Sequence, residues 1–572
     1  MKKLLVFLIF LLVFLLPGLF AFNLWSGKEN LEKAKASLLA ADFEKAKTTT
    51  LNSSRSFQRA KTYLSFFPFL GEIARIGELI GIGETLADAA FHLAKTGELG
   101  EKIVGIVLGR ETGELKKITG ELKMELGVVW KDLSLIEGEL GGKPILEIPE
   151  IRKEIEIAQE LLSILPEILP KEKRSYLFLL QNNMELRPTG GFIGSYALAI
   201  FENGKLLDFQ VEDVYTADGQ LRGHVEPPEA IKKYLGEAGW FLRDSNFDPD
   251  FPKTAKQVEW FFQKETGRAV DGVIGINLFV AQKILEALGP VKLSEYNETI
   301  TADNLFERAE YHSEIGFFPG STQKRDFLAS LTAQIFQEFK QTKKWLEIGK
   351  AMWQSLEEKQ ILVFLNDESA QKVFSQYYWD GSIREASDYL MVVESNFGVN
   401  KANYFLKRKL NLEIGLGEEI EEKLMIIYQN DSPGQTWPGG NYKNYLRVYT
   451  PLESQLLEVK IDEESLDLAK VDIFSSSGKT VFAFLVEVPV GAEKKVSLRY
   501  KIPLKLEDII PSYSLLFQKQ SGMGNDPLRV FISYPSFLKA GKMTSEALTG
   551  PQAILYNTNL SRDRVFIVEF TN

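Results

Sequence analysis

The residues best suited to chemistry lie in the stretch LRPTGGFIGSY, Leu186–Tyr196, near the middle of the chain. Arg187 supplies a planar cation that suits phosphate or carboxylate groups, and Thr189 supplies a hydroxyl. Gly190 and Gly191 leave the backbone bare, so that it can approach a ligand closely. Two interpretations stay open at this point. The stretch is either a tight turn that needs glycine or one wall of an anion-binding site.

A second cluster, FLRDSNFDPDFP, places polar side chains just ahead of an expected helix. It contains Arg243, Asp244, Asn246, Asp248 and Asp250, of which Arg243 and Asn246 are expected to contact a bound anion. The alternating oxygen-bearing side chains resemble the start of a calcium loop, but the turn glycine and the closing glutamate of such a loop are missing. A magnesium ion held by two carboxylates, Asp244 and Asp248, beside a bound phosphate is the metal chemistry that remains. For Asp250 the simpler interpretation is a helix N-cap or a charge in the first helical turn.

A third cluster lies in STQKRDFLASL, where Lys324 and Arg325 occupy the first turn of an expected helix. Cations at this end of a helix oppose its dipole, and a bound anion would remove the penalty. The alternative is a salt bridge to Asp326 or another neighbour. Acidic side chains come from EDVYTADGQ, which follows an expected strand and supplies Glu212, Asp213 and Asp218.

Composition excludes several kinds of function. The chain has 572 residues, enough for about two to four domains. Its net charge of −11 and its lack of long Lys/Arg runs argue against nucleic acid as a partner. There is no Cys, which excludes disulfides, zinc-thiolate sites and Cys nucleophiles. The three His residues are too scattered along the sequence to predict a metal centre.

The N-terminus predicts a membrane anchor. Lys2 and Lys3 precede Leu4–Phe22, a run without a charged residue that is long enough to span a bilayer as a helix. The two lysines would stay on the cytoplasmic side, which makes this a single-pass protein of the cell membrane with its large domain extracytoplasmic. The alternative is a cleaved signal peptide, although the Ala-x-Ala cleavage pattern is missing around Ala21.

Periodicity and turn signals divide the chain into five regions. Strands such as YLFLL and SYALAIFE alternate with helices in the centre, whereas short strands and turns fill the C-terminal part. The fold class expected is therefore multi-domain, with an N-terminal transmembrane helix, an α-helical stalk or bundle, a central α/β domain with a mixed sheet, and an antiparallel β-sandwich of Ig-like type. The expected regions are the anchor (1–25), the stalk (26–170), the α/β domain (171–345), an α/β extension (346–399) and the sandwich (400–572).

Several motifs carry a resemblance to a known family. LLQNNMELRPTGGFIGSYAL, RDSNFDPDFP, VDGVIGIN and FFPGSTQKRDFL resemble an uncharacterised bacterial envelope family, domain of unknown function 4012. The resemblance runs from about Tyr176 to Asn400. It implies a location in the envelope and no particular reaction.

The order of elements also resembles, more remotely, the LytR–CpsA–Psr family. Those membrane-anchored proteins transfer glycopolymers from a polyprenyl-pyrophosphate carrier to the cell wall. The resemblance implies that cations clamp a pyrophosphate and that a carboxylate, Asp244 or Asp213, holds Mg²⁺ for catalysis. The cations it implies are Arg187, Arg243, Lys324 and Arg325.

The chain departs from the LytR–CpsA–Psr pattern in places that matter for catalysis. Thr189 stands where that family has an Asp, and Val211–Val214 stands where it has Pro-Arg-Asp. Its later Arg-x-Arg has no counterpart around Tyr311–Glu314. The resemblance therefore implies the fold more directly than the reaction.

Two functions follow as expectations. The first is a membrane-anchored envelope protein that binds or transfers a polyprenyl-pyrophosphate-linked glycopolymer or another anionic glycan, and acts as a glycopolymer phosphotransferase if it is an enzyme. The alternative is a non-catalytic surface scaffold or adhesion protein whose α/β domain keeps a degenerate ligand site. A basic cleft lined by Arg187, Arg243 and Arg325 would favour the first, and burial of these residues in ion pairs would favour the second.

Overall fold

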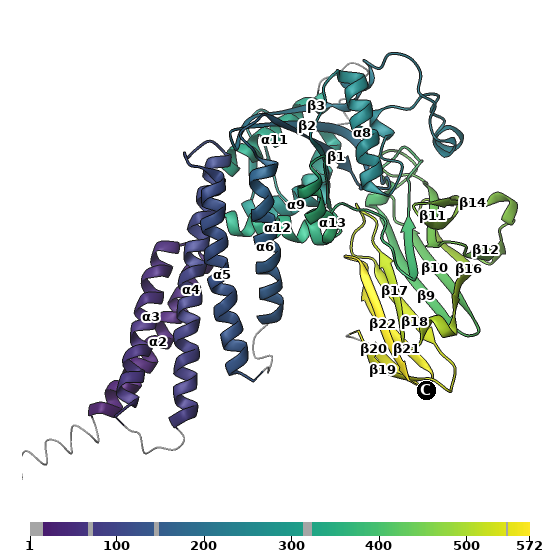
Figure 1. Ribbon diagram of the computed structural model, residues 1–572. Coiled ribbons are helices and arrows are strands. Elements are labelled where there is room, and N and C mark those ends of the chain that lie inside the picture. Colours follow the sequence, from purple (N-terminus) through teal and green to yellow (C-terminus); the bar gives the residue numbers. More distant parts are fainter. Residues whose placement is uncertain (1–14, 67–72, 142–147, 313–322, 545–546, 572) are drawn as a thin grey trace, which may run out of the picture. The chain divides into compact units, whose positions relative to one another are not determined.

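The structure is a computed structural model that describes residues 15–66, 73–141, 148–312, 323–544 and 547–571 (Figure 1). The chain divides into two compact units. The first consists of residues 1–174 with two short additions, 201–207 and 343–346. The second consists of residues 175–200, 208–342 and 347–572.

The first unit is built from helices in which each packs against the next along the chain. The helices are α2 (Leu16–Leu39), α3 (Phe43–Leu64), α4 (Ile73–Val107), α5 (Leu115–Glu139) and α6 (Ile148–Ile168). Small residues let neighbouring helices approach closely. A Cβ atom added at Gly27 or at Gly83 would lie within 3.0 Å of the Phe57 ring. Helix α3 begins after Asp42, whose carboxylate accepts a hydrogen bond from the N–H of Lys45.

The prediction of a membrane-spanning helix over Leu4–Phe22 is wrong, and so is the prediction of a signal anchor. Among the helices that the structure describes, none is both long and apolar enough to cross a bilayer. Residues 1–14, which hold most of the expected span, lie outside the described residues. Helix α2 begins at Leu16 and continues into charged sequence, where Lys28 pairs with Glu32. Only the first turns of the described helix therefore carry the apolar run.

A mixed five-stranded sheet begins the second unit, with strand order β3-β2-β1-β4-β7. Its strands are β1 (Arg174–Asn182), β2 (Phe192–Glu202), β3 (Lys205–Asp213), β4 (Gly272–Asn277) and β7 (Ile361–Leu365). Strand β4 runs parallel to β1 and antiparallel to β7. The β2–β3 turn consists of Asn203 and Gly204, which both have positive φ, as a tight two-residue hairpin turn requires.

Helices cover both faces of this sheet. Leu177 and Leu179 of β1 belong to one core with Phe261 and Phe262 of α8 (Phe251–Thr266). Phe178, which points to the opposite face, contacts Phe209 of β3. Phe209 in turn stacks on Phe336 of α11 (Gln323–Gln341). This alternation along β1 is the period-two pattern of a strand buried on both sides.

Shorter elements complete the region around the sheet. They are α7 (Val214–Asp218), α9 (Leu278–Leu288), β5 (Val291–Leu293), β6 (Glu298–Ile300), α10 (Leu305–Glu310), α12 (Trp345–Glu357) and α13 (Glu368–Gln376). The longer helix α8 ends at Gly267, which has a φ of 73° and so suits the left-handed end of a helix.

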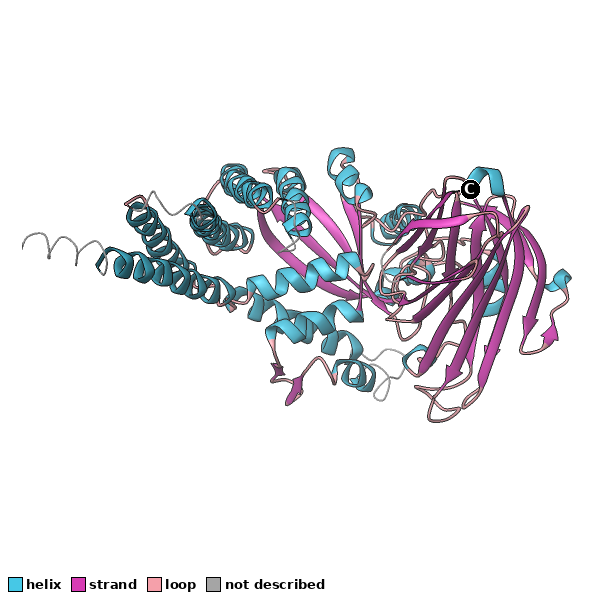
Figure 2. Ribbon diagram, turned by 90° about the horizontal axis from the view of Figure 1, so that it is seen from below, coloured by secondary structure: helices cyan, strands magenta, loops and turns pink. Residues whose placement is uncertain are grey.

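The rest of the second unit is a large β-sandwich whose strands gather around the C-terminus in Figure 2. One sheet has the order β13-β12-β16-β10-β9-β18-β21-β20, and the other has the order β14-β15-β11-β8-β17-β22-β19. Strands of the first sheet are β9 (Leu406–Leu416), β10 (Glu419–Asn430), β12 (Gln455–Ile461), β13 (Glu464–Ser465), β16 (Glu493–Lys505), β18 (Pro527–Ser533), β20 (Ala547–Gly550) and β21 (Ala553–Asn559). Strands of the second are β8 (Asp388–Val393), β11 (Tyr442–Pro451), β14 (Asp472–Ser476), β15 (Lys479–Val488), β17 (Ser512–Gln518), β19 (Lys539–Met543) and β22 (Arg564–Thr571).

The sandwich differs from the expected Ig-like, all-antiparallel form. It has more strands than that fold, and two neighbouring pairs, β8 with β17 and β9 with β18, run parallel. Strand β8 precedes the expected boundary at residue 400, yet it lies inside a sandwich sheet between β11 and β17. The expected extension 346–399 is therefore divided, because β7 belongs to the α/β sheet and β8 to the sandwich. Every residue of β8 is buried, as befits a central strand.

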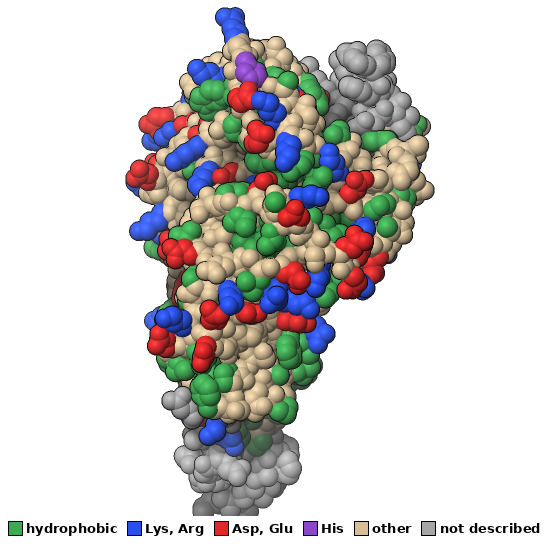
Figure 3. All heavy atoms as spheres, turned by 90° about the vertical axis from the view of Figure 1, so that its right-hand side faces the viewer, with side chains coloured by type: hydrophobic (Ala, Val, Ile, Leu, Met, Phe, Trp, Pro, Cys, Tyr) green, Lys and Arg blue, Asp and Glu red, His purple; other side chains and the backbone are tan. Residues whose placement is uncertain are grey.

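Charges on the molecular surface are mixed. On the face shown in Figure 3, Lys and Arg side chains are interspersed with Asp and Glu, and no large patch of one sign gathers there. Many exposed charges are paired across neighbouring strands, as Arg499 of β16 is with Glu421 of β10 at 3.5 Å. Such exposed pairs contribute little to stability.

Candidate functional site

The LRPTGG stretch forms the loop between β1 and β2, and amide hydrogen bonds close it. Gln181 donates to the carbonyl of Thr189 at 3.0 Å and accepts from the Thr189 hydroxyl at 3.0 Å. Asn246 donates to Gln181 and to the carbonyl of Gly191, both at 2.8 Å. Thr189 and Asn246 were predicted to bind an anion. Instead, the hydroxyl of Thr189 and the amide N–H groups of Asn246 are engaged in holding the loop.

Both glycines of the loop are required by the backbone. Gly190 has a φ of 133° and Gly191 a φ of 145°, a region that L side chains rarely adopt. A Cβ atom at Gly191 would lie 2.3 Å from the carbonyl carbon and oxygen of Asn182. The turn interpretation therefore accounts for these two residues without a ligand.

Arg187 is buried among polar groups of the chain, with 4% of its side chain exposed. Its guanidinium donates to a carboxylate oxygen of Glu185 at 3.1 Å and to the carbonyl of Asn396 at 2.5 Å. Its Nε lies 3.6 Å from Oδ1 of Asp244. Two carboxylates therefore neutralise the cation that was expected to face a ligand.

Arg243 belongs to the same network, because its Nε lies 3.4 Å from Oδ2 of Asp244. It also pairs with Asp218 and with Glu237, each at 2.9 Å. Burial raises the pKa of Asp218 to about 6, although Arg243 acts against this rise. Burial raises the pKa of Asp244 too, and the two arginines oppose it. The structure thus brings Arg187, Arg243 and Asp244 together, but as an internal ion network.

The remaining predicted site residues either make other contacts or have side chains outside the described part of the structure. Lys324 and Arg325 are in the first turn of α11, and their side chains are outside the described part of the structure. Asp213 caps α7 by accepting from the N–H of Tyr215 at 2.8 Å. Asp248 accepts from the N–H of Asp250 at 2.9 Å.

The magnesium site gains no support from this arrangement. Asp244 faces two guanidinium groups, and Asp248 holds a local turn. Within the described residues there is no group of three or more His, Asp or Glu side chains that could hold a metal ion. Magnesium at Asp244 and Asp248 stays a prediction.

The LRPTGG loop also joins the α/β sheet to the β-sandwich. Glu185 forms a 2.7 Å ion pair with Lys401. The N–H of Leu186 donates to Asn403 at 3.1 Å, and Gln520 donates to the carbonyl of Arg187 at 3.3 Å. Glu185 and Lys401 were not predicted from the sequence, although Glu185 directly precedes the LRPTGG stretch. No local pattern connects residues so far apart.

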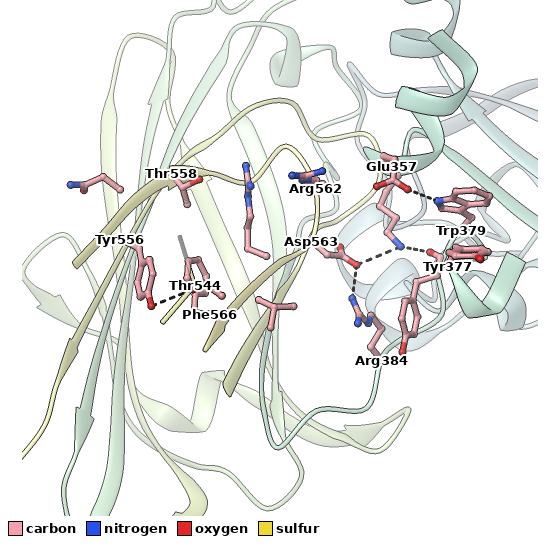
Figure 4. A pocket seen from close by; sticks show the side chains of 15 residues that line it. Glu357, Tyr377, Trp379, Arg384, Thr544, Tyr556, Thr558, Arg562, Asp563 and Phe566 are labelled. Atoms are coloured by element: carbon pink, nitrogen blue, oxygen red, sulfur yellow. Dashed lines mark hydrogen bonds and ion pairs between the residues drawn. The ribbon is translucent and has the colours of Figure 1, made fainter. Parts of the chain in front are cut away.

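A separate hollow of about 440 Å³ lies between the α12–α13 region and the last strands of the sandwich. In Figure 4, Glu357, Tyr377, Trp379 and Arg384 stand on one side, and Thr544, Tyr556, Thr558 and Phe566 stand on the other, with Asp563 between them. None of these residues was singled out in the sequence. The run Tyr377–Trp379 was a possible signal, since three consecutive aromatic residues follow a short helix.

Comparison with known proteins bears on the central segment. Residues 171–312 match the model of a family described as a protein of unknown function (DUF4012). This part of the chain is a DUF4012 segment. The match confirms the resemblance drawn from the LRPTGG and RDSNFDPDFP motifs over those residues. It covers β1 to α10 and therefore includes the buried ion network. No comparison shows the resemblance to the LytR–CpsA–Psr family.

Structural similarity to solved proteins is low. A proposed nutrient binding protein of Legionella pneumophila has a TM-score of 0.23 and 6% identity, over 29% of this chain and 67% of that one. Leukotriene A4 hydrolase of Saccharomyces cerevisiae has a TM-score of 0.20 and 7% identity, over 29% of each chain. An M1 zinc metallopeptidase of Deinococcus radiodurans has a TM-score of 0.18 and 11% identity, over 29% of this chain and 43% of that one. No curated protein matches the chain. Similarity at this level carries no argument about function.

Proposed function

We propose that the DUF4012 segment is a structural support that holds the β-sandwich in one fixed orientation, and that the protein acts as a scaffold. The observation that carries the proposal is the burial of Arg187 and Arg243 in ion pairs with carboxylates. This is the arrangement that favours the non-catalytic alternative. An extracytoplasmic location stays a prediction.

The first argument concerns the cost of freeing the cations. An anionic substrate at Arg187 would have to displace Glu185 and Asp244, whose side chains are 7% and 6% exposed. Leaving a buried carboxylate without its cation costs about 3–5 kcal/mol. Transfer of a polyprenyl-pyrophosphate-linked glycopolymer requires open cations that can stabilise a leaving pyrophosphate. The geometry therefore gives that reaction little support at this loop.

The second argument concerns the number of polar contacts that cross to the sandwich. Besides the LRPTGG loop, Gln360 donates to the carbonyl of Met523 at 2.8 Å, and Lys519 donates to the carbonyl of Glu358 at 2.7 Å. A further contact comes from Arg447 of β11, which donates to the carbonyl of Phe247 at 3.0 Å. Buried polar groups fix one relative position because each has few satisfactory partners. Such contacts are expected of a rigid support.

The proposal is tested by replacing Arg187 with Met in the full chain. We expect Arg187→Met to lower the free energy of unfolding by about 3 kcal/mol, since Glu185 then keeps only Lys401 and Asp244 keeps only Arg243 as a cationic partner. Hydrogen exchange should accelerate in β1 and β4 of the α/β sheet and equally in β9 and β18 of the sandwich. The matched control is Arg499→Met, which removes an exposed pair with Glu421 and should cost less than about 1 kcal/mol.

Two results would contradict the scaffold function. One is faster exchange confined to the α/β sheet, which would mean that the sandwich does not depend on the support. The other is Mg²⁺-dependent binding of farnesyl pyrophosphate, a soluble stand-in for the polyprenyl carrier, that Arg187→Met abolishes without loss of stability. That result would restore the transfer function.

A further inference from the structure

The hollow beside Asp563 carries an excess of positive charge in an acidic protein. Four cationic side chains and two carboxylates line it, whereas the whole chain has a net charge of −11. Asp563 is shared by Lys359 at 3.5 Å and Arg384 at 3.4 Å. Arg562 is exposed and forms no ion pair with any described residue. A hollow with this balance attracts anions, because the low-dielectric walls focus the field of its cations.

Aromatic rings form one wall and hydroxyl groups form the other. The ring of Tyr377 lies 5.1 Å from that of Trp379, whose Nε1 donates to Glu357 at 3.0 Å. On the facing side, Thr558 of β21 supplies a hydroxyl, and the Thr544 hydroxyl donates to that of Tyr556 at 3.3 Å. A sugar ring offers apolar C–H faces and a rim of hydroxyls, which match these two walls. The volume of about 440 Å³ falls in the range of small-molecule sites.

The backbone conformation of Tyr378 is a further indication of a functional site at this hollow. Tyr378 has a φ of 55° just after α13 ends, at a position that glycine usually occupies. Its ring lies under the guanidinium of Arg384, 3.6 Å from the ring centre. Its carbonyl accepts a hydrogen bond from Lys359. Bulky residues held at positive φ concentrate at functional sites, where the side chain is needed despite the strain.

We propose that this hollow binds an acidic sugar, that is, a sugar that carries a carboxylate or a phosphate group. Arg562 supplies the fork-shaped donor for the anion, assisted by the field of Arg384 and Lys359. Tyr377 supplies the aromatic face for the ring. The site is remote in sequence from the LRPTGG loop, and the proposal does not rest on the scaffold function.

Calorimetric titration of the full chain with four ligands tests the proposal. D-glucuronate carries a carboxylate, and glucose 6-phosphate carries a phosphate group. Glucose lacks the anionic group, and inorganic phosphate lacks the sugar ring. We expect both acidic sugars to bind, and whichever binds more tightly identifies the anion. Glucose and inorganic phosphate should each bind at least about tenfold more weakly, since each loses a charge-assisted contact or the ring contacts.

Two variants locate the binding. Arg562→Ala should weaken binding of the acidic sugar by about tenfold while the melting temperature stays unchanged, because the side chain is exposed and unpaired. Arg529→Ala is the control, an exposed cation on β18 outside the hollow, and its affinity should equal that of the wild type. Tyr377→Ala should weaken binding of both acidic sugars and leave inorganic phosphate unaffected.

Each other outcome overturns the proposal. If glucose bound as tightly as the acidic sugars, the cations would play no part in recognition. If inorganic phosphate bound as tightly, the sugar ring would play no part. Unchanged affinity in Arg562→Ala would place the ligand elsewhere. If neither acidic sugar binds in the millimolar range, the proposed site does not exist.

Discussion

Glu185 and Lys401 form a buried ion pair of 2.7 Å although 216 positions separate them in the chain. Their side chains are 7% and 8% exposed. Burial disfavours the ionised carboxylate of Glu185, but Lys401 and Arg187 more than offset this, so that the pKa of Glu185 is lowered. One charged group thus ties the DUF4012 segment to the start of the sandwich.

Removing the cation of this pair should weaken the whole second unit. We expect Lys401→Met to lower the free energy of unfolding by about 3 kcal/mol, because Glu185 keeps only Arg187 as a partner. The contribution of Glu185 is present above its ordinary pKa and is lost as the pH falls through its lowered folded pKa. Urea unfolding near neutral pH, where the contribution is complete, measures the loss. The double variant Glu185→Gln, Lys401→Met should recover part of it, and equal losses in the single and double variants would show that the pair is not coupled.

Glu265 should make stability fall as the pH rises. Its side chain is buried, with one oxygen accepting from the N–H of Leu242 at 3.1 Å and the other without a partner. Burial, together with the charge of Asp218, raises its pKa from 4.5 to about 8. The folded protein therefore holds a proton that the unfolded chain releases, and this stabilisation is complete below pH 4.5 and lost as the pH rises through about 8.

Glu265→Gln should accordingly have a higher melting temperature than the wild type above pH 8 and a similar one below pH 4.5. Thermal melts across this range measure the difference. The control is Glu286→Gln, an exposed position on α9, which should follow the wild type at every pH. A Glu265→Gln variant that is less stable than the wild type at alkaline pH would mean that the carboxylate has a partner when ionised.

Gly191 should tolerate no side chain. We expect Gly191→Ala to cost about 3 kcal/mol or more, since its Cβ would lie 2.3 Å from the carbonyl group of Asn182 and its φ is 145°. Gly223→Ala separates the two effects, because Gly223 has a φ of 94° and nothing within 4 Å of the added Cβ. That control should lose only about 1 kcal/mol. Chemical denaturation of both variants measures the loss in the free energy of unfolding. Equal losses would show that the close approach to Asn182 is not the cause.

A fragment of residues 400–572 should not fold as a unit. It lacks β8, which pairs with β11 on one side and with β17 on the other. The fragment would therefore expose two unpaired strand edges in the middle of one sheet, and such edges aggregate. We expect a broad thermal transition by circular dichroism and oligomers by sedimentation, whereas a fragment that begins at residue 385 should melt in one sharp step. A sharp transition of the shorter fragment would contradict this.

Local sequence signals predicted the elements well. YLFLL and SYALAIFE became β1 and β2, and Asn203-Gly204 became the tight turn between β2 and β3, because period and turn chemistry act over a few residues. The placement of β8 could not be predicted in this way, since its neighbours in the sheet come from distant segments. The membrane helix was predicted from apolar length alone, and the charged continuation of α2 was given too little weight.

The candidate site was predictable only in part. Arg187 and Arg243 were expected to meet at the edge of a sheet, and Asp244 lies between them. Their neutralisation was not predictable, because Glu185, Asp218 and Glu237 reach them from three separate segments. Likewise, no sequence pattern relates Arg384 to Asp563 across 179 positions.

The position of β8 also sets the order in which the chain can fold during synthesis. Asp388–Val393 leaves the ribosome well before β11, and longer still before β17, where Leu515 is the partner of Asp388. Until then the nascent chain carries an apolar segment whose two edges have no partner, a state that chaperones bind. Pairing over such distances raises contact order and slows folding. The sheet that contains β8 therefore closes only after β17 has been made.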